Sequence, residues 1–105
     1  MSERSKTHKT VLEKKMAIFI KELLKRKGIK GKTLKAKSGY GLGALYDFHK
    51  HISSRMFKTY VETIVELSGT LTDEEHDKAN NLLARKQQKE RELLNKKIQS
   101  LKNLD

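Results

Sequence analysis

The sequence predicts an all-α protein: a compact four- or five-helix bundle that includes a helix-turn-helix and continues into a long C-terminal helix. Apolar residues recur at helical spacing along the chain, and helix-capping signals precede several of these stretches. No glycine or proline interrupts the chain after Gly69. We expect a disordered basic arm over residues 1–9, a bundle domain over residues 10–71, and a long oligomerisation helix over residues 72–105.

Composition limits the class of protein. The chain has 105 residues, 35% of them hydrophobic, so it holds one domain with a small core. It contains no cysteine, which excludes disulfides. No apolar run approaches the ~18–20 residues that span a bilayer, and the N-terminus lacks the apolar region of a secretory signal. We therefore expect no membrane partner and a cytoplasmic, nucleoid-associated location.

The charge of the chain is uneven. The net charge is +11, and residues 1–50 contain 14 Lys and Arg against 4 Asp and Glu. Residues 72–105 are nearly balanced, with 8 against 7. A basic half is typical of a protein that binds nucleic acid, because lysines neutralise phosphates. The alternative is an ordinary solvated lysine surface, although such surfaces usually mix both signs.

The first helix is expected to begin at Thr10, because Thr10 and Glu13 fit a capping box. Its apolar stripe consists of Leu12, Met16, Phe19, Ile20 and Leu23. Lysine and arginine close the helix, and Gly28 supplies the C-cap.

Residues 28–52 form the predicted helix-turn-helix. The first helix spans residues 30–38, with Leu34 pointing inward, and Gly39 suits the left-handed position of the tight turn. The second helix is expected to begin at Tyr40 or Gly41 and to continue to about Lys50. In this arrangement the second helix enters the major groove of DNA.

Two more helices complete the prediction. One follows a cap at Ser53 or Ser54 and covers about residues 55–67. The other begins at a second capping box, Thr72 with Glu75, and continues to about Leu104. One cluster should bury six residues from across the bundle: Leu23, Leu34, Leu45, Phe48, Tyr60 and Ile64.

Residues 20–67 resemble the lambda-repressor/Cro-type (XRE) helix-turn-helix family. The resemblance rests on residues 20–29, Leu34, Ser38-Gly39, Leu45 with Phe48, and residues 60–67, at matching spacing and without a gap. It implies a small helical bundle that works as a dimeric regulator of transcription in phages, plasmids or bacteria. It also implies sequence-specific binding of double-stranded DNA.

The chain departs from the family pattern at several positions. Lys35 stands where the family usually has alanine, Gly31 where it often has glutamine, and His49 where it has glutamate. The predicted recognition helix begins with Gly41 and Gly43, which allow a close approach of the backbone to phosphate or of one helix to another. Side chains for direct readout of bases are then limited to four residues: Ala44, Tyr46, Asp47 and Lys50.

We expect the following residues to contact DNA, the basic ones through phosphates: Lys30, Lys32, Lys37, Tyr40, Gly41, Gly43, Ala44, Tyr46, Asp47, Lys50 and Arg55. One bundle covers one half-site, so a two-fold operator needs two protomers. The apolar stripe at the end of the last helix is the candidate dimer contact: Leu94, Ile98, Leu101 and Leu104. The alternative is a frayed, solvated tail.

No catalytic, metal-binding or cofactor-binding residue is expected, so we expect that the protein is not an enzyme. His49 and His51 lie two positions apart, which on a helix turns their rings away from each other. Two other functions remain open. The bundle could be a scaffold whose C-terminal helix docks a protein partner, or a non-specific nucleic-acid binder. Stacking platforms favour the last class, but we expect Phe19, Phe48, Phe57 and Tyr60 to be buried.

Overall fold

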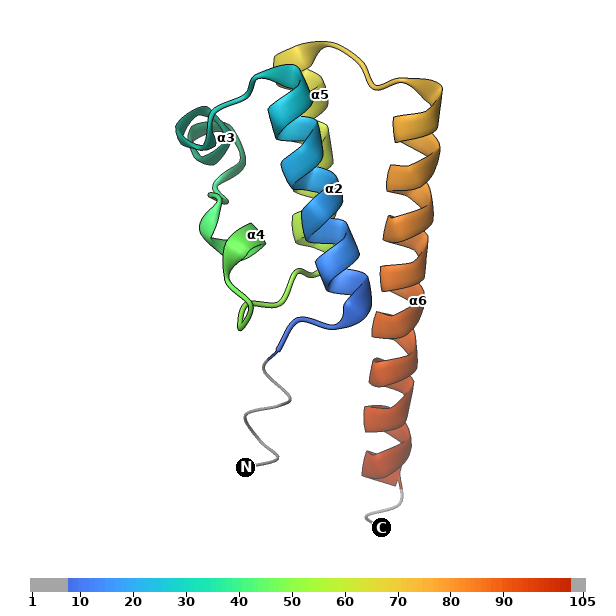
Figure 1. Ribbon diagram of the computed structural model, residues 1–105. Helices are drawn as coiled ribbons and strands as arrows, with labels where there is room; N and C mark the ends of the chain where they lie inside the picture. Colours follow the sequence, from blue (N-terminus) through green and yellow to red (C-terminus); the bar gives the residue numbers. More distant parts are fainter. Residues whose placement is uncertain (1–7, 103–105) are drawn as a thin grey trace.

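The computed structural model describes residues 8–102, and within that range the regular structure is entirely helical. The helices are α2 (Val11–Lys27), α3 (Gly31–Ser38), α4 (Gly43–Tyr46), α5 (Ser54–Ser68) and α6 (Asp73–Lys102). Helices α2 and α5 pack together at the centre, α3 and α4 lie on one side of them, and α6 lies on the other (Figure 1). The predicted all-α class with a long C-terminal helix is confirmed.

Helix α2 begins and ends as its capping signals predict. The Glu13 backbone N–H donates to Thr10 Oγ1 at 3.1 Å, and the Thr10 N–H donates to Glu13 Oε1 at 2.9 Å. Gly28 ends the helix in the left-handed conformation, with a φ of 66°. A side chain is strained at that φ, so glycine suits this C-cap.

Helices α5 and α6 also start at predicted caps. Ser53 accepts a hydrogen bond from the Met56 N–H at 3.1 Å. The Thr72–Glu75 capping box forms, and the Glu75 carboxylate also pairs with Arg26 of α2 at 3.0 Å. The hydrogen bond from the Thr72 backbone is the main cause that lowers the pKa of Glu75. The start of α6 is therefore tied to the end of α2.

The core lies at the centre of the bundle, where buried side chains of the five described helices and Ile52 meet. Of the six residues predicted to cluster there, five are buried: Leu23, Leu34, Leu45, Tyr60 and Ile64. The prediction is wrong for Phe48, which is 44% exposed. Phe48 lies beyond the end of α4 at Tyr46, so helical spacing no longer places it on the inward side with Leu45.

Helix α6 has a packed half and a projecting half. Ala79 and Leu82 are buried against α2 and α5, and Leu83 is half-buried beside them. From Arg91 to Lys102 every residue is exposed. A helix of 30 residues is ~45 Å long, and Figure 1 shows α6 continuing past the start of α2. Within residues 8–102 no helix is long and apolar enough to cross a membrane.

Candidate nucleic-acid interface

Helix α3 presents a positively charged surface. Leu34 is buried and holds the helix against α5, while Lys32 and Lys35 are exposed. Residues 28–46 contain four lysines and no acidic residue. Among the described residues, Lys30, Lys32 and Lys35 form no ion pair. The positive charge of this surface is therefore largely uncompensated.

The other predicted phosphate contacts differ in their surroundings. Lys37 pairs with Glu66 of α5 at 3.3 Å, and both side chains are about half-exposed or more. Lys50 and Arg55 are exposed, in the segment after α4 and in the first turn of α5. The Lys37 ammonium is thus the one of these cations whose charge a neighbouring carboxylate already offsets.

The turn between α3 and α4 is fixed from the core. Gly39 has a φ of 83°, as predicted for the tight turn. The Tyr60 hydroxyl of α5 donates to the Gly41 carbonyl at 2.8 Å, and burial raises the pKa of Tyr60 to about 12. The Tyr40 ring lies 5.8 Å from the Tyr60 ring and is half-buried. Tyr40 and Gly41 therefore position the turn, and Tyr40 offers only part of its surface to a ligand.

Helix α4 is much shorter than predicted. It covers four residues and ends at Asp47, whose backbone is extended, so the prediction that it continues to about Lys50 is wrong. The Asp47 carboxylate accepts a hydrogen bond from the His49 N–H at 2.8 Å, which forms a turn in place of another helical turn. No side chain caps the start of α4, and Gly43 weakens it.

Lys9 holds the segment that follows α4. Its side chain is buried, and its ammonium donates to the carbonyls of Ala44 and Lys50, each at 2.6 Å, and to that of Asp47. Its backbone N–H also donates to the Phe48 carbonyl at 2.9 Å. Burial lowers the pKa of Lys9. The prediction of a disordered arm over residues 1–9 is therefore wrong for Lys9, and residues 1–7 lie outside the described residues.

Glu13 holds the same segment from the other end. Its carboxylate is fully buried and accepts hydrogen bonds from the Ile52 N–H at 2.7 Å and from His51 Nδ1 at 2.9 Å. The Lys86 ammonium of α6 lies 3.5 Å away. Burial of the carboxyl favours a raised pKa, but the hydrogen bonds and the Lys86 charge lower the pKa to about 2. Glu13 thus joins α2, α6 and the segment after α4.

Tyr46 is the most exposed side chain of α4. It is 66% exposed, and the Lys21 ammonium of α2 lies 4.5 Å from the centre of its ring. Ala44 is half-buried, and its carbonyl is occupied by Lys9. Gly43 is exposed, and a Cβ added there would meet no atom within 4 Å. Helix packing therefore does not explain Gly43, which leaves close approach to a ligand as the remaining sequence-based interpretation.

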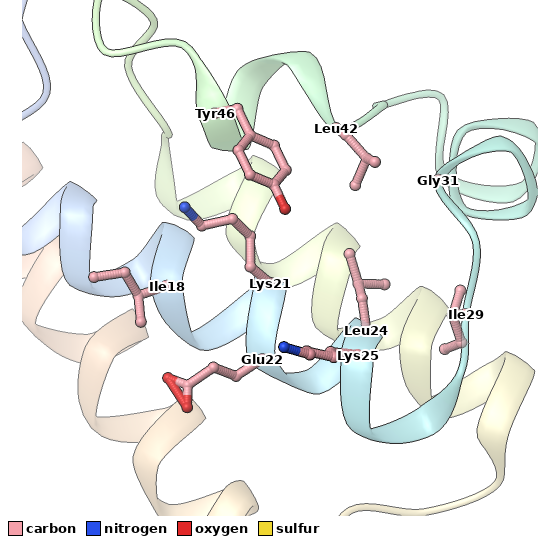
Figure 2. Close-up of a pocket in the computed structure, with 9 residues that line it drawn as sticks. All are labelled: Ile18, Lys21, Glu22, Leu24, Lys25, Ile29, Gly31, Leu42 and Tyr46. Atoms are coloured by element: carbon pink, nitrogen blue, oxygen red, sulfur yellow. The ribbon is translucent and has the colours of Figure 1, made fainter.

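An open groove separates α2 from α3 and α4. Figure 2 shows Lys21 and Leu24 of α2 pointing toward Tyr46 and Leu42 across it, and its volume is ≈ 560 Å³. At one end of the groove, a Cβ added to Gly31 would lie 2.5 Å from Leu42 Cδ1. A side chain at position 31 would therefore require Leu42 to move.

The possible metal ligands lie apart in the described part of the chain. Among residues 8–102, no group of three His, Cys, Asp or Glu side chains is placed to hold a metal ion. His49 and His51 have different neighbours: His49 lies beside the Phe48 ring, and His51 binds Glu13.

The predicted dimer contact is exposed. Leu94, Ile98 and Leu101 have no partner helix among residues 8–102, and Leu93 adds to the same exposed set. Leu104 lies outside the described residues. Shortly before this stripe, the Glu90 carboxylate accepts hydrogen bonds from the Ser54 N–H at 2.9 Å and the Ser54 hydroxyl at 2.5 Å. The packed half of α6 therefore extends to Glu90.

Comparison with known proteins leaves the family open. No protein-family model, curated protein or solved structure matches this chain. The resemblance to the lambda-repressor/Cro-type family therefore stays a prediction from the sequence.

Proposed function

We propose that this protein binds double-stranded DNA through the basic surface of α3 and the segment around α4, and regulates transcription as a dimer. One observation carries the proposal: Lys30, at the N-cap of α3, and Lys32 and Lys35, on α3, are exposed and have no acidic partner among residues 8–102. Duplex DNA offers matching phosphates, with one charge per ~1.7 Å of helix axis.

The surroundings of each lysine rank its proposed contribution. Lys32 is exposed and unpaired, so its full charge is available to a phosphate. Lys37 must first leave Glu66, 3.3 Å away, so its net contribution should be smaller. Lys50 and Arg55 extend the surface beyond α4.

Sequence preference is proposed to come from α4. Tyr46 is its most exposed side chain, and Gly43 leaves room for the backbone to approach a phosphate. Phosphate contacts position a protein on DNA, whereas contacts to base edges specify the sequence. Replacing Tyr46 with alanine should therefore change the preferred sequence more than the stability.

The proposed dimer uses the projecting half of α6. A single bundle reaches one half-site, and two half-sites about one helical turn apart need two protomers. Leu94, Ile98 and Leu101 are exposed apolar side chains on that half. Contact with a second copy would remove them from water.

The same stripe favours a second candidate function. If the projecting half of α6 binds a different protein, the bundle would be a scaffold that regulates a partner, and the lysines would serve solubility. Sedimentation of the pure protein separates the two: a monomer with an exposed stripe favours a different partner.

The test of the proposed function is binding of a random duplex and of a duplex library at two salt concentrations. We expect binding that weakens steeply with salt, together with enrichment of a two-fold sequence from the library. Salt-dependent binding without enrichment supports a non-specific nucleic-acid binder. No duplex affinity at low salt would refute the proposal.

A further inference from the structure

The segment between α4 and α5 is held rigidly although it is not part of a helix. Lys9 binds backbone carbonyls at Ala44, Asp47 and Lys50. The Glu13 carboxylate binds the Ile52 N–H at 2.7 Å. Burying a charged side chain costs free energy unless hydrogen bonds compensate it. Two buried charged side chains, Lys9 and Glu13, bind this one surface segment, which indicates that its conformation is functionally important.

This braced segment presents aromatic rings at the surface. Phe48 is 44% exposed, and its ring centre lies 4.5 Å from that of His8 and 5.5 Å from that of His49. The two histidine rings lie 5.0 Å apart. We call these three residues the ring cluster. The segment after α4, which carries Phe48 and His49, lies on the same side of α2 as α3 (Figure 1).

Positive charge surrounds the ring cluster. The Lys14 ammonium lies 4.9 Å from the centre of the Phe48 ring, and Lys50 is exposed two residues further along the chain. Two carboxylates, Asp47 and Glu13, lie close to this segment and accept backbone hydrogen bonds from His49 and Ile52. The ammonium groups of Lys9, Lys14 and Lys50 outnumber them. Exposed rings between cations suit a ligand that has both a flat π-face and a phosphate.

We propose that the ring cluster stacks on a nucleobase at an opened step of the duplex that α3 binds. The inference rests on the proposed function and names the part of the DNA that the segment after α4 would contact. Apolar side chains inserted at a base step unstack it partly and bend the duplex. The bracing by Lys9 and Glu13 reduces the conformational entropy that such a contact would otherwise cost.

The test uses the full chain and three DNA probes of one sequence: an intact duplex, the same duplex with a single unpaired base, and one strand alone. An unpaired base spares the cost of opening a step, so we expect about tenfold tighter binding of the bulged duplex than of the intact one. Phe48→Ala should abolish this preference, and Phe48→Tyr should retain it. Val11→Ala is the matched control, because Val11 is also apolar and exposed.

The outcomes separate the inference from the proposed function. Equal affinity of the unmodified chain for the two duplexes, or a preference that survives Phe48→Ala, overturns the inference while salt-dependent duplex binding still supports the proposed function. Binding of the single strand as tightly as the bulged duplex also overturns it, because the base would then come from a single strand. Absence of binding to the intact duplex at low salt refutes the proposed function itself.

Discussion

Lys9 and Glu13 are buried charges of opposite sign at the start of α2, and each satisfies backbone groups rather than the other's charge. The Lys9 ammonium donates hydrogen bonds to the carbonyls of Ala44, within α4, and of Lys50, beyond it. The Glu13 carboxylate accepts hydrogen bonds from the N–H groups of Thr10 and Ile52. Buried ions of this kind are tolerated because their hydrogen bonds are complete. Together they determine where the chain goes between α4 and α5.

Replacement of Lys9 by methionine should destabilise the protein by about 2–3 kcal/mol, because hydrogen bonds to a charged group are among the stronger ones. The amides of residues 47–50 should also lose protection against hydrogen exchange. Lys15→Met is the matched control, since Lys15 lies nearby in the sequence but is exposed on α2. Equal stability of the two variants would contradict the role of Lys9.

Glu13 should make stability depend on pH in the acid range. Its pKa is about 2 in the folded state, below the ordinary value of 4.5, so its stabilisation is present above pH 4.5 and is lost as pH falls towards 2. The loss should amount to about 3 kcal/mol, since one pKa unit corresponds to ~1.4 kcal/mol.

Urea unfolding of the unmodified chain and of Glu13→Gln between pH 6 and pH 2 measures this effect. Other carboxylates titrate in both proteins, so the difference between the two isolates Glu13. The difference should shrink as pH falls. A constant difference across the range would show that the charge of Glu13 does not stabilise the fold.

The sequence did not predict the roles of Lys9, Glu13 and Phe48 for one physical reason. Each depends on partners 35 or more positions away, such as Glu13 with Ile52 or Lys9 with Ala44. The local sequence pattern identifies Glu13 only as the acidic residue of a capping box, three positions after Thr10. Phe48 was assigned to the core by continuing helical spacing past a point where the helix has already ended.

At the scale of elements, local signals predicted most helix ends correctly. Thr10, Ser53 and Thr72 cap helices through their own neighbours, and Gly28 and Gly39 adopt positive φ as expected. These interactions span at most a few residues, so a sequence shows them directly. The predicted length of α4 was wrong because Asp47 forms a turn that competes with the helix, and because Lys9 binds the Lys50 carbonyl beyond that turn.

Two glycines should respond oppositely to alanine. Gly43 has an ordinary backbone conformation and open space around it, so Gly43→Ala should stabilise the fold by about 0.5–1 kcal/mol through helix propensity. Gly39 has a φ of 83°, so Gly39→Ala should destabilise it by roughly 1–2 kcal/mol. Thermal unfolding of both variants checks this, and destabilisation by Gly43→Ala would contradict the structure of α4.

Removal of the projecting half of α6 should separate assembly from folding. A chain ending at Glu92 keeps Glu90, whose carboxylate binds Ser54 at the start of α5. It should stay folded, become monomeric in sedimentation, and bind a duplex with two half-sites much more weakly. Ile98→Glu in the full chain is a second variant with the same expectation. Unchanged mass and affinity in both would refute a role for the stripe in dimerisation.

At the scale of the whole molecule, α3, which carries lysines without an acidic partner among the described residues, lies on the side of α2 and α5 opposite α6 (Figure 1). Carboxylates of α5 and α6 form ion pairs with other cations of α2 and α3: Glu75 pairs with Arg26, and Glu66 pairs with Lys37. The uneven charge seen in the sequence thus becomes one basic surface. The sequence predicted this surface from composition, whereas the braced segment beside it required the structure.

The salt dependence of duplex binding tests the central claim most directly. The slope of log Kd against log salt should fall by about 0.9 per protomer in Lys32→Ala, because one phosphate contact is lost. Lys89→Ala, which removes the same charge from exposed α6, should leave the slope unchanged. Equal slopes in the two variants, or no binding at low salt by the unmodified chain, would contradict DNA binding through α3.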